Sequence, residues 1–155
     1  NDKGGELMDR TFRGLIAGII AGIVMNVWNL TDFYLFHITN LRLLDWVAVL
    51  TSGEKSQSFF QSITDLIIQL IWDGFLGIIF AHLLIKITSR GVIVKSVLYG
   101  TLCWFFFRVI AILFKITPLI AGHTFPSRFS NLLGAVLWGI VLGSFLKQFD
   151  KIPEK

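Results

Sequence analysis

Four long apolar stretches limit the folds open to this chain more than any other feature of its sequence. They cover residues 14–36, 63–87, 92–116 and 131–149. Each approaches or exceeds the roughly 20 residues that an α-helix needs to cross about 30 Å of hydrocarbon. Because a segment in lipid has to satisfy its own backbone hydrogen bonds, such stretches predict membrane-spanning helices. We therefore expect an all-α polytopic membrane protein with four transmembrane helices.

The composition agrees with a membrane protein. Hydrophobic residues make up 54% of the 155 residues and charged residues 15%, whereas soluble domains are about 45–50% apolar and about 25% charged. Four spans leave little room for a soluble domain. We therefore expect a single membrane domain over residues 1–155, in contact with the lipid bilayer.

The distribution of basic residues predicts an orientation in the membrane. The formal net charge is +4, but the basic residues do not gather on one face, so we expect no nucleic-acid partner. Lys and Arg are retained on the cytoplasmic side of membranes. The N-terminus, the second connection and the C-terminus are the richer segments, so we expect a multi-pass protein of the cell membrane with both termini cytoplasmic. Their basic residues are Lys3, Arg10, Arg13, Lys86, Arg90, Lys95, Lys147, Lys151 and Lys155.

The second half of the chain repeats short patterns of the first. "LFHITNL" at residues 35–41 recurs as "LFKITPL" at residues 113–119. Trp72 and Gly77 of the second span fall on Trp138 and Gly143 of the fourth without a gap. Similarity at a fixed offset is typical of duplicated units, although chance similarity between apolar spans is an alternative. We expect two tandem hairpins, at about 13–87 and 90–150.

The two connections inside these hairpins differ. Residues 41–50 of the first are apolar, contain Trp46 and are too short to span, so they predict an interfacial or re-entrant helix. The connection inside the second hairpin is short, and Pro118 and Pro126 predict that it is interrupted by turns.

Small residues follow one face of the first span and one face of the fourth. A Gly-x-x-x-Gly series lets another backbone approach closely in lipid, where apolar burial gives no incentive. Such faces indicate helix packing either within the chain or against a second subunit. The helix-packing candidates are Gly14, Gly18, Gly22, Ala135, Gly139 and Gly143.

Polar residues continue the glycine face of the first span and recur in the second and third. Because charged groups in lipid are costly unless they are paired, we expect a polar interior in which Arg108 reaches Asp73 or Asp32. This interior is either a site for an ion or solute or a structural pair that fixes the helix register. The candidate binding residues are Asn26, Asn29, Asp32, Gln69, Asp73 and Arg108.

Signatures of catalysis do not occur in the sequence. No His, Cys or carboxylate residues have metal-ligand spacing, and the chain has neither a glycine-rich phosphate loop nor a nucleophile elbow. We therefore expect no enzymatic activity, no metal and no cofactor. The single cysteine, Cys103, is interpreted as a small core residue. Trp28, Trp72, Trp104 and Trp138 are interpreted as packing residues, with a cage for a cation as the alternative.

Two motifs of the second half carry a resemblance to a known family. "YGTLCW" at residues 99–104 and "LWGIVLGSF" at residues 137–145 resemble the Tyr-Gly-x-x-x-Trp and Tyr/Trp-Gly-x-x-x-Gly patterns of small four-span YqhR-type membrane proteins of Gram-positive bacteria. The resemblance covers about the last 60 residues. It implies a small four-span fold and a membrane location, and it brings no functional residues.

Two hypotheses of function follow from these patterns. The first is a non-enzymatic membrane protein that assembles with itself or with another membrane subunit through its small-residue faces. The alternative is a small transporter or channel component that binds an ion or a polar solute at the intramembrane Asp, Arg and Asn residues.

Overall fold

The computed structural model describes residues 3–87, 91–120 and 124–149, with side chains from residue 10 onward. It is all-helical over these residues, and four of its helical segments are long and apolar enough to cross a membrane. The prediction of a four-span integral membrane protein is confirmed. The elements in chain order are α1 (Lys3–Thr31), the π-helical turn η1 (Asp32–Phe36), α2 (Leu43–Ser52), α3 (Phe59–Lys86), α4 (Val92–Leu113), α5 (Thr117–Ile120) and α6 (Phe125–Phe149).

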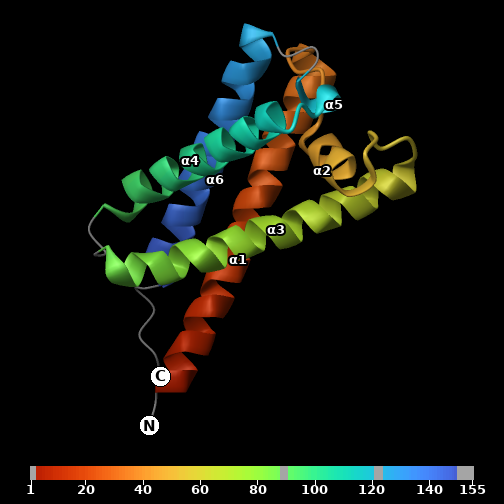
Figure 1. Cartoon of the computed structure of the whole chain (residues 1–155). Coiled ribbons are helices and arrows are strands. Elements are labelled where there is room, and N and C mark those ends of the chain that lie inside the picture. The colour runs from red at the N-terminus through yellow and green to blue at the C-terminus, as the bar shows by residue number, and fades with distance from the viewer. Residues whose placement is uncertain (1–2, 88–90, 121–123, 150–155) are drawn as a thin grey trace.

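The long helices pair as two consecutive hairpins. Helix α1 packs along α3, and α4 packs along α6. A further interface between α1 and α6 joins the two hairpins, whereas α3 and α4 touch only slightly. Figure 1 shows α1 and α6 running steeply through the molecule, with α3 and α4 crossing them. The predicted tandem hairpins are therefore confirmed. Helices α3 and α4, one from each hairpin, diverge from each other.

Glycines bring the helices of the first hairpin into backbone contact. A Cβ atom at Gly18 would lie 2.9 Å from the Gly74 Cα atom, and one at Gly77 would lie 2.8 Å from the Gly18 Cα atom. A Cβ atom at Gly14 would lie 2.8 Å from the Gly77 carbonyl oxygen. Side chains do not tolerate such distances, so this crossing requires glycine on both helices.

The second hairpin is packed in the same way. A Cβ atom at Gly139 would lie 2.6 Å from the Ser96 carbonyl oxygen, and one at Gly143 would lie 2.9 Å from the Ile93 Cα atom. One added to Gly100 would lie 2.8 Å from the carbonyl oxygen of buried Ala135. Both small-residue faces predicted from the sequence thus pack within the chain.

The connection between α1 and α3 contains the predicted short helix. Helix α2 starts at Leu43 and ends at Ser52, and Gly53 takes the left-handed conformation, with φ of 82°, that commonly closes a helix. The start of α3 lies four residues before the predicted span, because the Ser58 side chain accepts a hydrogen bond from the Gln61 N–H and caps it.

The two prolines of the second connection begin helices instead of breaking them. Pro118 lies in the first turn of α5 and Pro126 in the first turn of α6. Proline is accepted there because the first N–H groups of a helix have no partner within it. Helix α6 therefore starts six residues before the predicted span. Helix α4 ends three residues before its predicted end, and Lys115 turns the chain with a positive φ of 52°.

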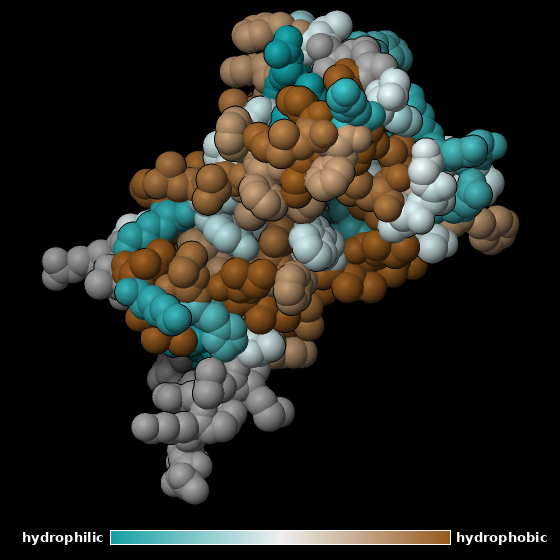
Figure 2. Space-filling view, viewed as in Figure 1, coloured by the Kyte–Doolittle hydropathy of each residue, from teal (hydrophilic) through white to brown (hydrophobic). Residues whose placement is uncertain are grey.

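The surface is that of a protein surrounded by lipid. Large apolar side chains on all four spans are exposed, among them Val27, Ile71, Leu102 and Phe129. Figure 2 shows apolar residues over the middle of the visible face and hydrophilic residues gathered toward its margins. At one end of the bundle, the Arg13 Nη1 group donates a 3.2 Å hydrogen bond to the Phe149 carbonyl oxygen, so the start of the first span and the end of the last lie together.

Candidate functional site

A cavity of about 360 Å³ opens where α3 and α4 diverge, and we call it the membrane cavity. Five helices line it, and α2 contributes Leu43, Trp46, Val47, Leu50 and Thr51. Most of the other lining side chains are apolar or aromatic. They are Met25, Ile68, Gln69, Trp72, Asp73, Leu76, Gly100, Cys103, Trp104, Phe107, Asn131, Ala135 and Trp138.

Four of these residues carry a buried polar atom without a hydrogen-bond partner among the described residues. The atoms are Gln69 Oε1, Asp73 Oδ2, Asn131 Oδ1 and Trp138 Nε1. Gln69, Asp73 and Trp138 are only 5%, 4% and 3% exposed, respectively. Buried polar groups are nearly always hydrogen-bonded, and leaving one unpaired costs about 1–3 kcal/mol. Their gathering in one apolar cavity is typical of a ligand site, where a few polar groups orient a molecule.

Helical spacing explains how these four residues converge. Gln69 and Asp73 are four residues apart on α3, and Asn131 and Trp138 are seven apart on α6, so each pair lies on one face of its helix. Each hairpin thus contributes one pair. The site therefore depends on the α1–α6 interface that joins the hairpins.

Gly22 makes room for the carboxyl group of Asp73. A Cβ atom at Gly22 would lie 2.9 Å from the Asp73 Cβ and Cγ atoms and would overlap Asp73 Oδ2. The carboxyl group therefore lies against bare α1 backbone. This glycine belongs to the predicted packing face, and in the structure it also shapes the site.

The polar residues predicted on the first span serve the scaffold. Asn26 Nδ2 donates a 2.9 Å hydrogen bond to the Gly22 carbonyl oxygen of its own helix. Asn29 Oδ1 accepts a 2.7 Å hydrogen bond from the Leu43 N–H and thereby ties the start of α2 to α1. Asp32 is fully buried, and its Oδ2 accepts a 2.6 Å hydrogen bond from Ser130 Oγ of α6.

Arg108 does not have the acidic partner that the sequence suggested. Its Nη1 group donates a 3.1 Å hydrogen bond to the Leu119 carbonyl oxygen of α5. The interactions described for it include no ion pair with Asp73 or Asp32. The physical reason is the divergence of α4 from α3, with the connection folding back so that an α5 carbonyl lies within reach. The expected Arg108–Asp73 pair was therefore wrong.

An ion pair holds the start of α2, outside the spans. Arg42 Nη2 lies 2.8 Å from Asp45 Oδ1, and Arg42 Nε donates a 3.0 Å hydrogen bond to Asp45 Oδ2. The hydrogen bond to Asp45 raises the pKa of Arg42 from its ordinary value, so the guanidinium stays charged. Together with the Asn29 contact, this pair fixes the helix that covers part of the membrane cavity.

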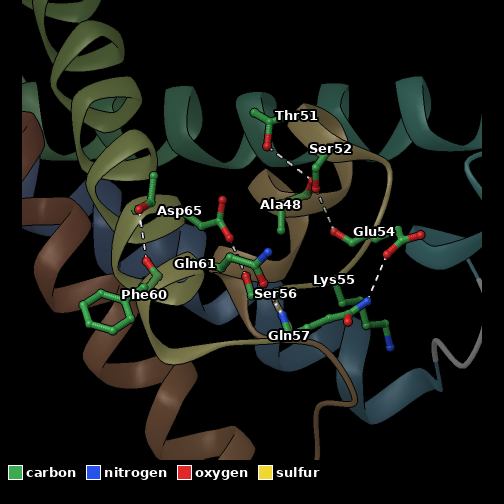
Figure 3. A pocket seen from close by; sticks show the side chains of 11 residues that line it. Ala48, Thr51, Ser52, Glu54, Lys55, Ser56, Gln57, Phe60, Gln61 and Asp65 are labelled. Atoms are coloured by element: carbon green, nitrogen blue, oxygen red, sulfur yellow. Dashed lines mark hydrogen bonds between the residues drawn. The ribbon is translucent and has the colours of Figure 1, made fainter.

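A second hollow lies beside α2, and we call it the loop pocket. It has a volume of about 410 Å³ and is lined by α2, by the loop after it and by the start of α3. Figure 3 shows Ser56 of the loop pointing to Asp65 of α3, whose Oδ2 accepts its hydrogen bond, and Gln57 donating to Glu54. Thr51 lines both the loop pocket and the membrane cavity.

The sequence predicted only part of the membrane cavity. Gln69 and Asp73 were predicted from their spacing and polarity, and they line it. Asn131 was considered only for packing and for the repeat, and Trp138 for these or for a cation cage, although their seven-residue spacing puts them on one helix face. Four tryptophans of different helices also meet here, which no local signal could reveal. They are Trp46, Trp72, Trp104 and Trp138.

Comparisons with known proteins identify no relative for this chain. No family profile, no curated protein and no solved structure matches it. The resemblance of residues 99–104 and 137–145 to YqhR-type membrane proteins therefore stays a prediction.

Proposed function

We propose that this integral membrane protein binds a small molecule in the membrane cavity, as a component of a transport system. The observation that carries the proposal is the cavity itself, because four of its lining residues carry a buried polar atom that has no partner in the described part of the chain. An ionisable residue inside a membrane span is a functional candidate by default. Asp73 is such a residue, and it lines this cavity.

Assembly through the small-residue faces receives less support. Gly18 and Gly139 pack against helices of the same chain, so these faces are not free for a second subunit. A homo-oligomer or another membrane subunit stays a prediction and would have to use other surfaces. The absence of enzymatic activity also stays a prediction.

We also propose that the two hairpins are structural repeats. The first and third spans correspond at an offset of 78 residues, which pairs Gly18 with Ser96 and Gly22 with Gly100. The second and fourth correspond at an offset of 66. Equivalent contacts support this alignment: Gly18 lies against Gly77 in one hairpin, and the equivalent Ser96 lies against the equivalent Gly143 in the other.

The binding proposal is tested with N-phenyl-1-naphthylamine, a neutral apolar fluorescent probe, and protein in lipid nanodiscs. Energy transfer from the cavity tryptophans to the probe reports saturable binding. Replacing Cys103 by Phe fills part of the cavity, and we expect affinity to fall by about tenfold, which corresponds to about 1.4 kcal/mol.

The matched control is Leu102→Phe, because Leu102 is the neighbouring residue and is 64% exposed to lipid. We expect this variant to bind as the unaltered protein does. Equal affinity of Cys103→Phe and the unaltered protein, or a complete lack of saturable binding, would contradict the proposal.

A further inference from the structure

The aromatic lining of the membrane cavity restricts what it can bind. Trp46 comes from α2, Trp72 from α3, Trp104 and Phe107 from α4, and Trp138 from α6. Aromatic rings attract cations through the negative face of the ring, and tryptophan does so best. A neutral apolar ligand would need only aliphatic walls, such as Ile68 and Leu76 supply. The concentration of indole rings therefore favours a positively charged ligand with an apolar body.

The charge of the lining has the complementary sign. Among the described lining residues, Asp73 is the one that carries a formal charge when ionised. Gln69 Oε1 and Asn131 Oδ1 add two oxygen acceptors without partners. Both basic residues of α4, Lys95 and Arg108, lie outside the lining, and Arg108 donates to the Leu119 carbonyl oxygen. A buried carboxylate without a protein cation binds either a proton or a positively charged ligand.

A polar stripe on α3 leads from the loop pocket to this carboxyl group. Asp65, Gln69 and Asp73 follow one another at four-residue spacing and therefore lie on one face of α3. Asp65 lines the loop pocket, whereas Gln69 and Asp73 line the membrane cavity. The loop pocket carries the carboxylates of Glu54 and Asp65 beside a single ammonium, that of Lys55. This arrangement suits the entry of a cation better than that of an anion.

We infer that the membrane cavity binds a hydrophobic organic cation, with the Asp73 carboxylate as its counter-charge and the four tryptophans around its apolar body. This inference rests on the proposed binding function and specifies its ligand class. A metal ion fits the lining less well, because hard cations take about six or more oxygen ligands and this wall is mostly carbon.

The rate of chemical modification of Cys103 can report binding, because this residue is the chain's single cysteine and lines the cavity. The rate at which N-ethylmaleimide modifies Cys103 is followed by mass spectrometry in unaltered protein in nanodiscs. Three probes of similar size are added in turn: tetraphenylphosphonium, which is cationic; triphenylphosphine oxide, which is neutral; and tetraphenylborate, which is anionic. We expect tetraphenylphosphonium to halve the rate at a concentration about tenfold below that of the neutral probe. Tetraphenylborate should not protect Cys103.

A matched pair of variants tests the role of the carboxylate. Asp73→Asn keeps the shape of the side chain and removes its charge, so we expect protection by tetraphenylphosphonium to weaken by about tenfold. Protection by triphenylphosphine oxide should be unchanged in this variant. Asp65→Asn is the control, since it removes a charge from the same face of α3 outside the membrane cavity. We expect its effect on protection to be smaller.

The outcomes separate this inference from the proposed function. Equal protection by the cationic and neutral probes would contradict the inference that the ligand is an organic cation. It would not contradict the proposed binding function. The same conclusion would follow if Asp73→Asn left cation protection unchanged. If none of the probes changed the modification rate of Cys103, both proposals would fall. The comparison of the three probes needs no variant, so a folding defect of Asp73→Asn would not prevent a decision.

Discussion

Two buried carboxyl groups in this chain have contrasting surroundings. Asp32 accepts a hydrogen bond from Ser130 Oγ, and the Trp28 Nε1 group reaches the Ser130 carbonyl oxygen at 3.2 Å. Asp73 Oδ2 has no partner among the described residues and lies in a cavity wall. Asp32 Oδ1 is also without a partner among the described residues, so the contrast rests on Asp32 Oδ2, whose hydrogen bond ties η1 to α6, and on the cavity that Asp73 lines. We therefore assign Asp32 to the scaffold and Asp73 to the site.

The scaffold role of Asp32 can be tested at Ser130. Replacing Ser130 by Ala leaves both oxygens of the buried Asp32 carboxyl without a described partner, because Asp32 Oδ1 already has none. We expect the free energy of unfolding to fall by about 1–3 kcal/mol, measured by unfolding in mixed detergent micelles.

Ser144→Ala is the control for Ser130→Ala, because the Ser144 hydroxyl donates only to the Ile140 carbonyl oxygen of its own helix. We expect a change of less than about 0.5 kcal/mol there. Equal effects of the two variants would show that the Ser130–Asp32 hydrogen bond contributes no net stability.

At the scale of single residues, the sequence predicted the helix face on which a polar side chain lies but not the group to which it forms a hydrogen bond. Periodicity put Asn29 and Asp32 on one face of the first span and Gln69 and Asp73 on one face of α3, because helical spacing is a local property. It could not identify the α2 N–H that Asn29 accepts from, or the α5 carbonyl that Arg108 reaches. Those partners lie in connections whose paths depend on the packing of whole helices.

Among the helices, close backbone contact occurs at the glycines of both hairpins. The contact requires that no side chain stand at the crossing, which is why Gly18 and Gly139 occupy it. The consequence is that a single methyl group at either position forces the helices apart.

We expect Gly18→Ala and Gly139→Ala each to lower the free energy of unfolding by about 1–3 kcal/mol, the usual effect of overpacking. The added methyl group would overlap the Asp73 carbonyl oxygen in the first case and the Ser96 carbonyl oxygen in the second. Backbone atoms cannot yield as a flexible side chain can. Unfolding in mixed detergent micelles measures both variants.

Gly134→Ala is the matched control, because Gly134 is also a mid-helix glycine of a span. Its added Cβ atom would meet Trp28 Cδ1 at 3.5 Å and Met25 Cγ at 3.6 Å, which are ordinary contacts. We expect a change between zero and a gain of about 1 kcal/mol from the better helix propensity of alanine. A loss as large as that of Gly18→Ala would mean that crossing distance does not decide the effect.

For the molecule as a whole, an even number of spans places the start of the first span and the end of the fourth on the same side of the membrane. The Arg13 hydrogen bond to the Phe149 carbonyl oxygen agrees with this. We propose that this side is cytoplasmic, from the distribution of basic residues. Part of that argument rests on side chains outside the described ones, those of Lys3, Arg90, Lys151 and Lys155.

The orientation can be checked by cysteine labelling in a Cys103→Ala background. New cysteines replace the uncharged residues Gln57, Ile87 and Gln148, so the basic residues that set the topology stay in place. We expect a membrane-impermeant maleimide to label position 57 in intact cells, and positions 87 and 148 only after permeabilisation. The reverse pattern would overturn the orientation, and opposite sides for positions 87 and 148 would overturn the four-span topology.

The sequence by itself determined the four spans, the short helix between the first two and the faces that carry glycine and polar residues. These follow from hydrophobic length and from helical periodicity, which act within one segment. Only the tertiary structure decided which helices touch, and thereby formed the membrane cavity where α3 and α4 diverge. The gathering of Asn131, Trp138 and three further tryptophans in the lining of this cavity is a property of that divergence, because residues from separate helices become neighbours only when the helices pack.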